Sequence, residues 1–332
     1  MTTPIRVAVI GSTAFSASDF IDLLLDDGRF QVLGISRSPE TEPTLLPHLR
    51  HGGARYGFRQ LHLVTQMAEV LAALDDFQPT YVVNYAAQGE VGSSFLHPEA
   101  HFATNTMAMV ALTNALKDRT WLGRYVHIST PEIYGSCDGA VSEDQPINPS
   151  SPYAASKAAA DLFTGVLHRS HGFPVTWIRA TNVYGPHQQL YRIIPRTVIY
   201  SRLGRTLRLD GGGQAVKSYI HIRDVSRGTL AAMLHGLPGR VYHLSPDQGV
   251  SIRAVVESVC RLMGRDMASL VEIGPERPGQ DRAYILDSSR ARSELGWAPG
   301  ITFEAGLKQV VEWIDRDWSR IRELDLNFNF KV

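Results

Sequence analysis

A tyrosine and a lysine four residues apart, Tyr153 and Lys157, are the residues of this chain best suited to carry out chemistry. On a helix this spacing places both side chains on one face. A free phenol has a pKa of ~10, and a neighbouring ammonium lowers it by stabilising the phenolate. Such a pair can take the proton of an alcohol while a hydride leaves the same carbon, which predicts redox chemistry at a carbinol. Alone, the spacing also fits two residues on an exposed helix surface.

A second group of candidates lies upstream, in the run HISTPEIYG from 127 to 135. It follows a predicted strand, so Thr130 and Glu132 are expected on an extended exit, where alternate side chains share a face. Pro131 between them biases Thr130 toward an extended backbone. Glu132 could act as a base there, and the alternative is a hydrogen-bonded structural carboxylate.

A candidate dinucleotide turn follows the first predicted strand. It reads G-x-x-A-x-x-A, where a glycine-rich pyrophosphate turn would open a helix. Gly11 can make the tight turn, but Ala14 adds a methyl where backbone approaches phosphate, and Ala17 adds one where helix meets strand. A strand–turn–helix without a ligand is the alternative. The predicted cofactor contacts, besides Tyr153 and Lys157, are Gly11, Thr13, Ala14, Phe15, Ser16, Ser36, Arg37, Ser38, Ala86, Ala87 and Asn105.

Together with RATNVYGP at 179–186, these blocks resemble the extended short-chain dehydrogenases, most closely the dTDP-glucose 4,6-dehydratases, from about Ile5 to Trp313. The resemblance implies bound NAD(P) and a nucleotide-sugar substrate. Tyr153 would take the C4 hydroxyl proton, Thr130 would hydrogen-bond the same oxygen, and Lys157 would hold the nicotinamide ribose. Glu132 would remove the C5 proton, and loss of water would then lead to a 4-keto-6-deoxy sugar.

The chain departs from that family at the acid and at the cofactor ribose. The family has an aspartic acid where this chain has Pro131, so either Glu132 serves as base and acid, or Glu90 supplies the proton. Arg37 stands where NAD enzymes offer a carboxylate to the ribose, and a guanidinium suits a 2′-phosphate. The run from Ser36 to Ser38 also resembles that of the NADP-using GDP-mannose 4,6-dehydratases, which favours NADP over an exposed, solvated arginine.

Polar residues in the later part of the chain are candidates for holding the substrate, since two phosphate charges need local partners. By resemblance, Asn182 would bind a phosphate oxygen between Lys217 and Arg277. Lys217 replaces the arginine usual there and offers a point charge instead of a fork. The predicted substrate contacts are Glu90, Asn182, Arg192, Lys217 and Arg277.

Hydrophobic periodicity predicts the elements that position these residues. The expected strands are 5–10, 31–36, 81–85, 124–129 and 175–179, and the expected helices are 15–27, 67–76, 100–117, 153–169, 193–203, 223–235, 252–263 and 303–321. Residues 38–60 are expected to form a loop. Alternating strands and helices predict an α/β fold, a Rossmann-type doubly wound parallel sheet with a smaller α/β substrate-binding lobe. The dinucleotide-binding part would span 1–180 and about 222–248, and the lobe 181–221 and 249–332.

Composition excludes several other classes of protein. Lys+Arg 33 balances Asp+Glu 33, which gives no overall field for nucleic acid or an anionic membrane. Two cysteines make neither a disulfide framework nor a cysteine-rich metal site, and no metal is expected. We expect a cytoplasmic protein, because the N-terminus lacks a signal-peptide pattern. By resemblance, helices 100–117 and 153–169 would pair across a homodimer.

Three other functions remain open at this point. A nucleotide-sugar 4-epimerase or a decarboxylase of a uronic acid nucleotide would use the same Tyr153 and Lys157. An inactive nucleotide-binding regulatory protein would fit the altered glycine turn and the missing acid. Against inactivity stand Thr130, Glu132, Tyr153 and Lys157, which a binding module would not need together.

Overall fold

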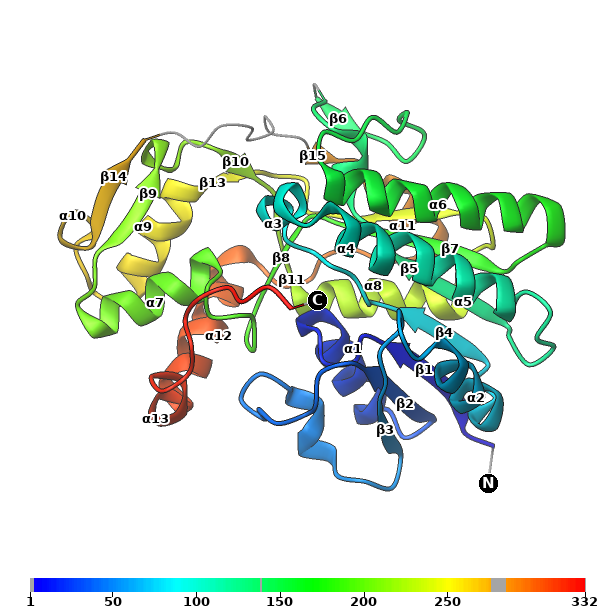
Figure 1. Ribbon diagram of the computed structural model, residues 1–332. Helices are drawn as coiled ribbons and strands as arrows, with labels where there is room; N and C mark the ends of the chain where they lie inside the picture. Colours follow the sequence, from blue (N-terminus) through cyan, green and yellow to red (C-terminus); the bar gives the residue numbers. More distant parts are fainter. Residues whose placement is uncertain (1–2, 138, 276–284, 332) are drawn as a thin grey trace.

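The computed structural model describes residues 3–137, 139–275 and 285–331. Its centre is a seven-stranded sheet in the order β12-β7-β5-β4-β1-β2-β3, with every neighbouring pair parallel (Figure 1). Its strands are β1 (Ile5–Ile10), β2 (Phe30–Ser36), β3 (Tyr56–Gln60), β4 (Tyr81–Asn84), β5 (Arg124–Ile128), β7 (Val175–Ala180) and β12 (Val241–Leu244). The predicted Rossmann-type fold is confirmed.

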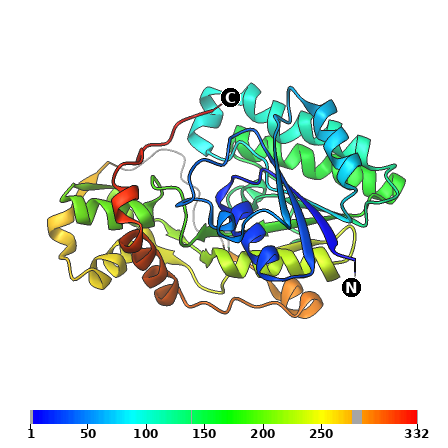
Figure 2. The same ribbon diagram turned by 90° about the horizontal axis from the view of Figure 1, so that it is seen from below.

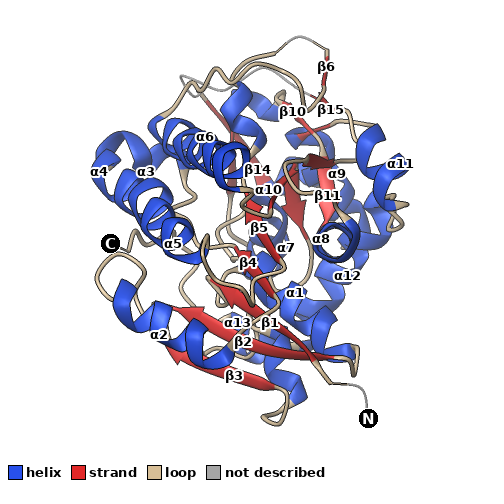
Figure 3. Ribbon diagram, turned by 90° about the vertical axis from the view of Figure 1, so that its right-hand side faces the viewer, coloured by secondary structure: helices blue, strands red, loops and turns tan. Residues whose placement is uncertain are grey.

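Helices cover both faces of this sheet, which explains why its central strands are mostly apolar (Figure 3). One apolar layer joins the sheet to Phe20 of α1 and Met233 of α8. The other joins it to Leu74 of α2, Leu112 of α5 and Leu167 of α6. The covering helices are α1 (Phe15–Asp26), α8 (Ile222–His235) and α11 (Ser289–Leu295) on the first face, and α2 (Met67–Phe77), α5 (Ala108–Leu116) and α6 (Pro152–His171) on the second.

A smaller lobe lies beside the sheet and has a core of its own, in which Val198, Val259 and Trp313 are buried (Figure 2). Its helices are α7 (Ile193–Leu203), α9 (Ile252–Leu262), α10 (Met267–Leu270), α12 (Phe303–Arg316) and α13 (Trp318–Ile321). Paired short strands complete it: β8 (Asn182–Tyr184) with β11 (Tyr219–His221), β9 (Leu207–Asp210) with β14 (Val271–Gly274), and β10 (Val216–Lys217) with β13 (Val250–Ser251). A further pair joins β6 (Ala140–Val141) to β15 (Ile285–Leu286).

Three predicted stretches differ from the structure. The expected loop 38–60 contains the edge strand β3 and a short 3-10 helix, Pro47–His51. The expected helix 100–117 is divided into α4 (Pro98–Phe102), a π-helical turn over Ala103–Met107 and α5. The expected helix 303–321 breaks after Arg316. Strand β12 joins the sheet from a segment where no strand was predicted.

The remaining short helices are α3 (Val91–Leu96) and the 3-10 turns Pro131–Tyr134 and Gly211–Gly213. Among the described residues, no helix combines the length and the apolar character that crossing a membrane requires.

Candidate active site

The turn between β1 and α1 is built for an anion although it has one glycine. Gly11 has φ +80°, and a Cβ added there would lie 2.6 Å from the backbone nitrogen of Ala86. Ala14 is the N-cap of α1, and no side chain caps the first amides of the helix. Those amides and the helix dipole suit the pyrophosphate of a dinucleotide. The residues present therefore fit such a cofactor, with Ala17 fully buried where the helix packs on the sheet.

Ser36, Arg37 and Ser38 follow β2, beside the same turn. The hydroxyls of Thr13 and Ser36 are 2.7 Å apart and tie the turn to the strand end. The Arg37 side chain is partly buried, and that burial lowers its pKa. Among the described residues, no carboxylate forms an ion pair with its guanidinium, so its charge is available to a ligand.

Asn105 holds the loop that follows β4. Its side chain accepts a hydrogen bond from the Gln88 amide at 2.8 Å and donates to the Gln88 carbonyl at 3.0 Å. It also donates to Ser156 Oγ at 3.0 Å, so it joins this loop to α6. Asn105 is fully buried within the π-helical turn, a type of irregularity that is frequent at functional sites. The structure gives Asn105 a positioning role, while Ala86 and Ala87 lie in the loop itself.

Helix α6 carries Tyr153 and Lys157 in its first two turns. Ser151 caps it by accepting from the Ala154 amide at 3.2 Å, and Pro152 occupies the first helical position. Lys157 Nζ is buried and donates to the Ile128 carbonyl at 2.7 Å. Burial lowers the pKa of Lys157 to about 8, and the charge of Asp161 opposes that shift. The ammonium is therefore largely charged at neutral pH.

Thr130, Glu132 and Tyr153 lie together at the carboxyl end of β5. Burial raises the pKa of the Tyr153 phenol, and the charge of Glu132 raises it further. A hydrogen bond with Thr130 and the charge of Arg192 lower it. The pKa of Tyr153 is therefore raised, whereas Lys157 alone was expected to lower it. Burial outweighs the effect of the Arg192 charge. These interactions place a hydroxyl, a carboxylate and a phenol within reach of one substrate.

The expectation that Glu132 lies on an extended exit is wrong. Thr130 is extended, with φ −145° and ψ 145°, as the following proline predicts, but Pro131–Tyr134 forms a 3-10 turn. Thr130 caps that turn by accepting from the Glu132 amide at 3.3 Å. Pro131 is buried at its first position, so no side chain there can donate a proton.

Glu90, the second candidate for the missing acid, caps α3. Its two carboxylate oxygens accept from the amides of Gly92, at 3.1 Å, and Ser93, at 2.5 Å. Both oxygens are thus engaged with the main chain. A capping carboxylate stabilises the helix start, which assigns Glu90 a structural role.

A buried polar network behind α6 was not predicted from the sequence. Asp161, one turn after Lys157, accepts from Ser129 Oγ at 2.6 Å and from Arg179 at 2.9 Å. Arg179 also donates to the Tyr134 hydroxyl, which lies 2.7 Å from His243 Nε2. Tyr134 ends the 3-10 turn that carries Glu132, so this network holds that turn against the sheet. The i, i+4 spacing of lysine and aspartate was the available signal.

Three of the predicted substrate contacts, Asn182, Arg192 and Lys217, lie in the smaller lobe, whereas Glu90 lies at the start of α3. Asn182 is exposed on β8 and donates to the carbonyl of Ser218, the residue after Lys217, at 3.3 Å. Arg192 is exposed at the start of α7 and lies over the Tyr191 ring, and its charge acts on Tyr153. The structure therefore brings Asn182 close to Lys217 and Arg192 close to the catalytic group. Arg277 lies outside the described residues.

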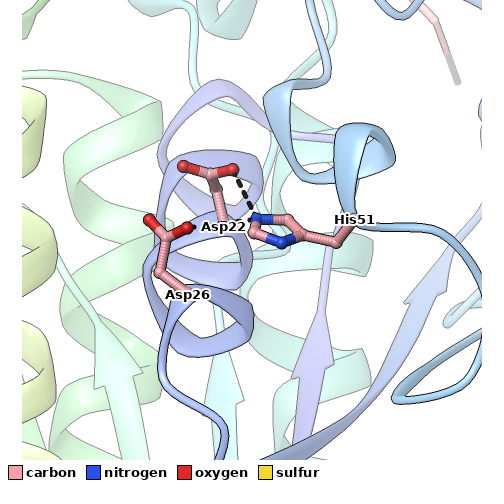
Figure 4. Close-up of side chains that lie close together, drawn as sticks. All are labelled: Asp22, Asp26 and His51. Carbon is pink, nitrogen blue, oxygen red and sulfur yellow. Dashed lines mark hydrogen bonds and ion pairs between the residues drawn. The ribbon is translucent and has the colours of Figure 1, made fainter.

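A cluster of two carboxylates and a histidine at α1 does not suit a metal ion. Asp22, Asp26 and His51 lie close together, with His51 Nε2 3.0 Å from Asp22 (Figure 4). Arg50 pairs with both carboxylates, and Arg223 donates to Asp22 at 2.7 Å. Two guanidinium groups thus neutralise the charge that a cation would need.

Known proteins share this arrangement over nearly the whole chain. The sequence model of the family described as GDP-mannose 4,6 dehydratase matches residues 9–310. A dTDP-glucose 4,6-dehydratase of Streptomyces niveus is 33% identical over 329 residues, which are 94% of this chain and 94% of that protein. The structure of a dTDP-glucose 4,6-dehydratase from Streptomyces venezuelae, with NAD and TYD bound, has a TM-score of 0.86 and 30% identity, covering 95% and 98% of the two chains. A UDP-glucuronic acid 4-epimerase from Bacillus cereus, in complex with UDP-glucuronic acid and NAD, has a TM-score of 0.85 and 25% identity, covering 94% and 99%.

Proposed function

Because the chain belongs to the GDP-mannose 4,6 dehydratase family of extended short-chain dehydrogenases and is an NAD(P)-dependent nucleotide-sugar 4,6-dehydratase, we propose that its substrate is dTDP-glucose. The catalytic groups are Thr130, Glu132, Tyr153 and Lys157. The observation that carries this proposal is their convergence at the end of β5, where the pKa of Tyr153 responds to both Thr130 and Glu132. The choice of thymine as the nucleobase of the substrate rests on the dTDP-glucose dehydratases among its relatives.

The residues divide the reaction between them. Gly11 and the start of α1 would hold the pyrophosphate of the dinucleotide, whose nicotinamide, when bound, would supply a hydride acceptor for C4 and later the donor for C6. The positive charge of a bound oxidised nicotinamide would offset the burial that raises the pKa of Tyr153 and favour its phenolate. Tyr153 then takes the proton of the C4 hydroxyl, and Thr130 hydrogen-bonds the same oxygen. The C4 ketone acidifies the C5 hydrogen, which Glu132 removes as base.

Glu132 also protonates the departing C6 hydroxyl. Since Pro131 has no proton to donate and both Glu90 oxygens face backbone amides, Glu132 is the acid best placed for this step. A single carboxyl can serve as base and then as acid when both transferred protons lie on one side of the sugar. Loss of water leaves a C5–C6 double bond, which accepts the hydride at C6 and a solvent-exchangeable proton at C5. The proton that Tyr153 took from the C4 hydroxyl balances this last transfer.

For the cofactor we propose NADP rather than NAD. Arg37 and two flanking serines follow β2, and no described carboxylate pairs with the guanidinium. A 2′-phosphate offers Arg37 the bidentate partner that a ribose hydroxyl cannot.

We further propose that the enzyme is a cytoplasmic homodimer. Four large apolar side chains are exposed along α4 to α6, namely Phe102, Met107, Leu162 and Val166. A cluster of such residues marks a surface that binds another protein. Both cysteines are free thiols, in keeping with a reducing compartment.

Incubation with dTDP-glucose and NADP in deuterated water tests the proposed function. The expected product carries deuterium at C5 and a new methyl at C6, as read by NMR. An epimerase would form neither, and a decarboxylase would release carbon dioxide from a uronic acid nucleotide. Tyr153→Phe, which keeps the ring but lacks the hydroxyl, should lower the rate by roughly 10²- to 10⁴-fold.

A further inference from the structure

The C-terminal segment Leu324–Lys331 crosses from the smaller lobe to the catalytic end of the sheet. It leaves the lobe after α13 and ends near α3 and α4, which Figures 1 and 2 show from two directions. Here it is called the strap. Phe330 lies more than 200 residues along the chain from the groups that it contacts, so no local pattern accounts for its position.

Beyond Leu326, which is buried in the core of the lobe, three contacts hold the strap in place. Near its middle, Phe328 packs edge-on against Tyr191, with ring centroids 5.4 Å apart. Near its end, Phe330 stacks on His97 with centroids 4.4 Å apart and an interplanar angle of 14°. The carbonyl of Lys331 accepts a hydrogen bond from Gln88 Nε2 at 2.7 Å.

These anchors all adjoin catalytic groups. Gln88 is buried in the loop that Asn105 holds, at the end of β4 where the nicotinamide would lie. Phe330 is 6.3 Å from the His101 ring, which in turn meets the Tyr153 ring edge-on at 6.2 Å. His101 therefore lies between the strap and Tyr153.

The strap also contacts the smaller lobe beside a predicted substrate residue. Tyr191, its partner there, precedes Arg192, whose charge acts on Tyr153. The segment thus bridges the cofactor loop and the sugar-binding lobe across the catalytic centre. A segment that contacts both the cofactor loop and the substrate-binding lobe can hold the site closed when cofactor and substrate are bound.

We propose that Leu324–Lys331 closes over the bound nucleotide-sugar, with Phe330 as the residue that fastens it. This inference rests on the proposed function, because a dehydratase must retain an unsaturated sugar until the hydride returns to C6, and closure excludes water meanwhile. The start of the strap is fixed by Leu326, which is buried in the core of the lobe, while the end is held by one hydrogen bond and by ring contacts. A hydrogen bond contributes only about 1 kcal/mol net, so the end can open while the start stays in place.

Limited proteolysis measures closure without using activity. Chymotrypsin cleaves after phenylalanine, and Phe328 is 39% exposed. In the unliganded protein, His97→Ala should speed the cut at Phe328 roughly fivefold by removing the stacking partner of Phe330. In Tyr153→Phe, which binds without turnover, dTDP-glucose with NADP should slow the same cut.

Kinetics of Phe330→Ala supply the second readout. We expect kcat/KM for dTDP-glucose to fall roughly five- to tenfold. Phe58→Ala is the matched control, since it removes the same ring from β3 at the far edge of the sheet and should leave both readouts unchanged.

Three results would contradict the proposal that the strap closes over the substrate. Cutting that accelerates with ligands, or a higher kcat/KM in Phe330→Ala, would make the segment an inhibitory plug. An unchanged rate of cleavage at Phe328 in His97→Ala would show that the stacking of Phe330 on His97 does not hold the strap in place. Failure of the proposed function is distinct, because the wild-type protein would then form no C6-methyl product whatever the cutting rates.

Discussion

Lys157 Nζ donates a hydrogen bond of 2.7 Å to the carbonyl of Ile128, the last residue of β5. The same strand end continues into Thr130 and Glu132. This hydrogen bond therefore fixes Lys157, the proposed ribose contact, relative to Thr130 and Glu132, the proposed sugar contacts. Asp161, one helical turn after Lys157, extends that link to Arg179 on β7.

Activity should fall as the pH rises through about 8. Burial lowers the pKa of Lys157 to that value, so the ammonium is present below it and lost above it. A pH profile of kcat/KM is the measurement. The fold itself is not weakened by this titration: with an ordinary pKa of 10.5 in the unfolded chain, neutral Lys157 makes burial less costly as the pH rises from 8 to 10.5. Activity that stayed constant to pH 10 would contradict the assignment.

Glu132→Gln should separate oxidation from elimination. The amide cannot remove the C5 proton, while Tyr153 and Thr130 still act at C4. We expect reduced nicotinamide to form from dTDP-glucose, seen by absorbance, but deuterium incorporation at C5 to drop by roughly 10²- to 10⁴-fold. Full dehydration by this variant would disprove the role of Glu132.

Glu90→Ala should affect stability more than chemistry. The substitution removes both acceptors of the Gly92 and Ser93 amides, and loss of such a cap costs about 1 kcal/mol. Urea unfolding measures this change. Glu90→Gln keeps one acceptor for the helix amides and should dehydrate dTDP-glucose at close to the wild-type rate. A large loss of dehydration rate in this variant would instead identify Glu90 as the acid.

Arg37→Ser should shift the cofactor preference from NADP toward NAD. The variant loses a charge-assisted hydrogen bond to the 2′-phosphate, so the affinity for NADP should fall about tenfold while that for NAD changes little. Titration of both dinucleotides gives the ratio. Arg29→Ser is a suitable control, because Arg29 is an exposed arginine already paired with Asp27. Equal losses for both dinucleotides would count against a 2′-phosphate contact.

Leu162→Glu should produce a monomer. Leu162 is 58% exposed on α6, within the apolar patch formed by Phe102, Met107 and Val166, and a carboxylate there would have to be desolvated in an interface. Light scattering gives the mass in solution. Ile273→Glu places the same charge at a residue 65% exposed on β14 and should stay dimeric. A monomeric wild-type protein would refute the homodimer.

The sheet could be predicted because its strands are buried on both faces and follow a regular alternation with helices. Strand β3 was missed since it lies at the edge, where Arg59 and Gln60 are exposed and the apolar pattern is weak. Strand β12 was missed because it is short and contains His243, whose burial depends on Tyr134. Both strands are fixed by pairing with distant segments.

Candidate catalytic residues could be found from motif spacing, but their surroundings could not. The spacing of Tyr153 and Lys157 predicts a shared helix face, whereas the pKa of Tyr153 depends on burial and on Glu132. Arg179 lies in a block identified from the sequence, yet its contacts with Asp161 and Tyr134 arise where three segments meet. The position of Phe330 depends on His97, which has no sequence relation to the end of the chain.

The path of the chain between sheet and lobe has a consequence for how this enzyme can be divided. The chain enters the lobe at β8, returns to the sheet for α8 and β12, leaves again at β13, and returns once more for α11 before α12. No single cut yields one fragment with the whole sheet and another with the whole lobe. Substrate range cannot therefore be exchanged between relatives by fusing the front of one gene to the back of another. A chimera must transfer the lobe segments together, with the α8–β12 return and α11 kept from the parent that supplies the sheet.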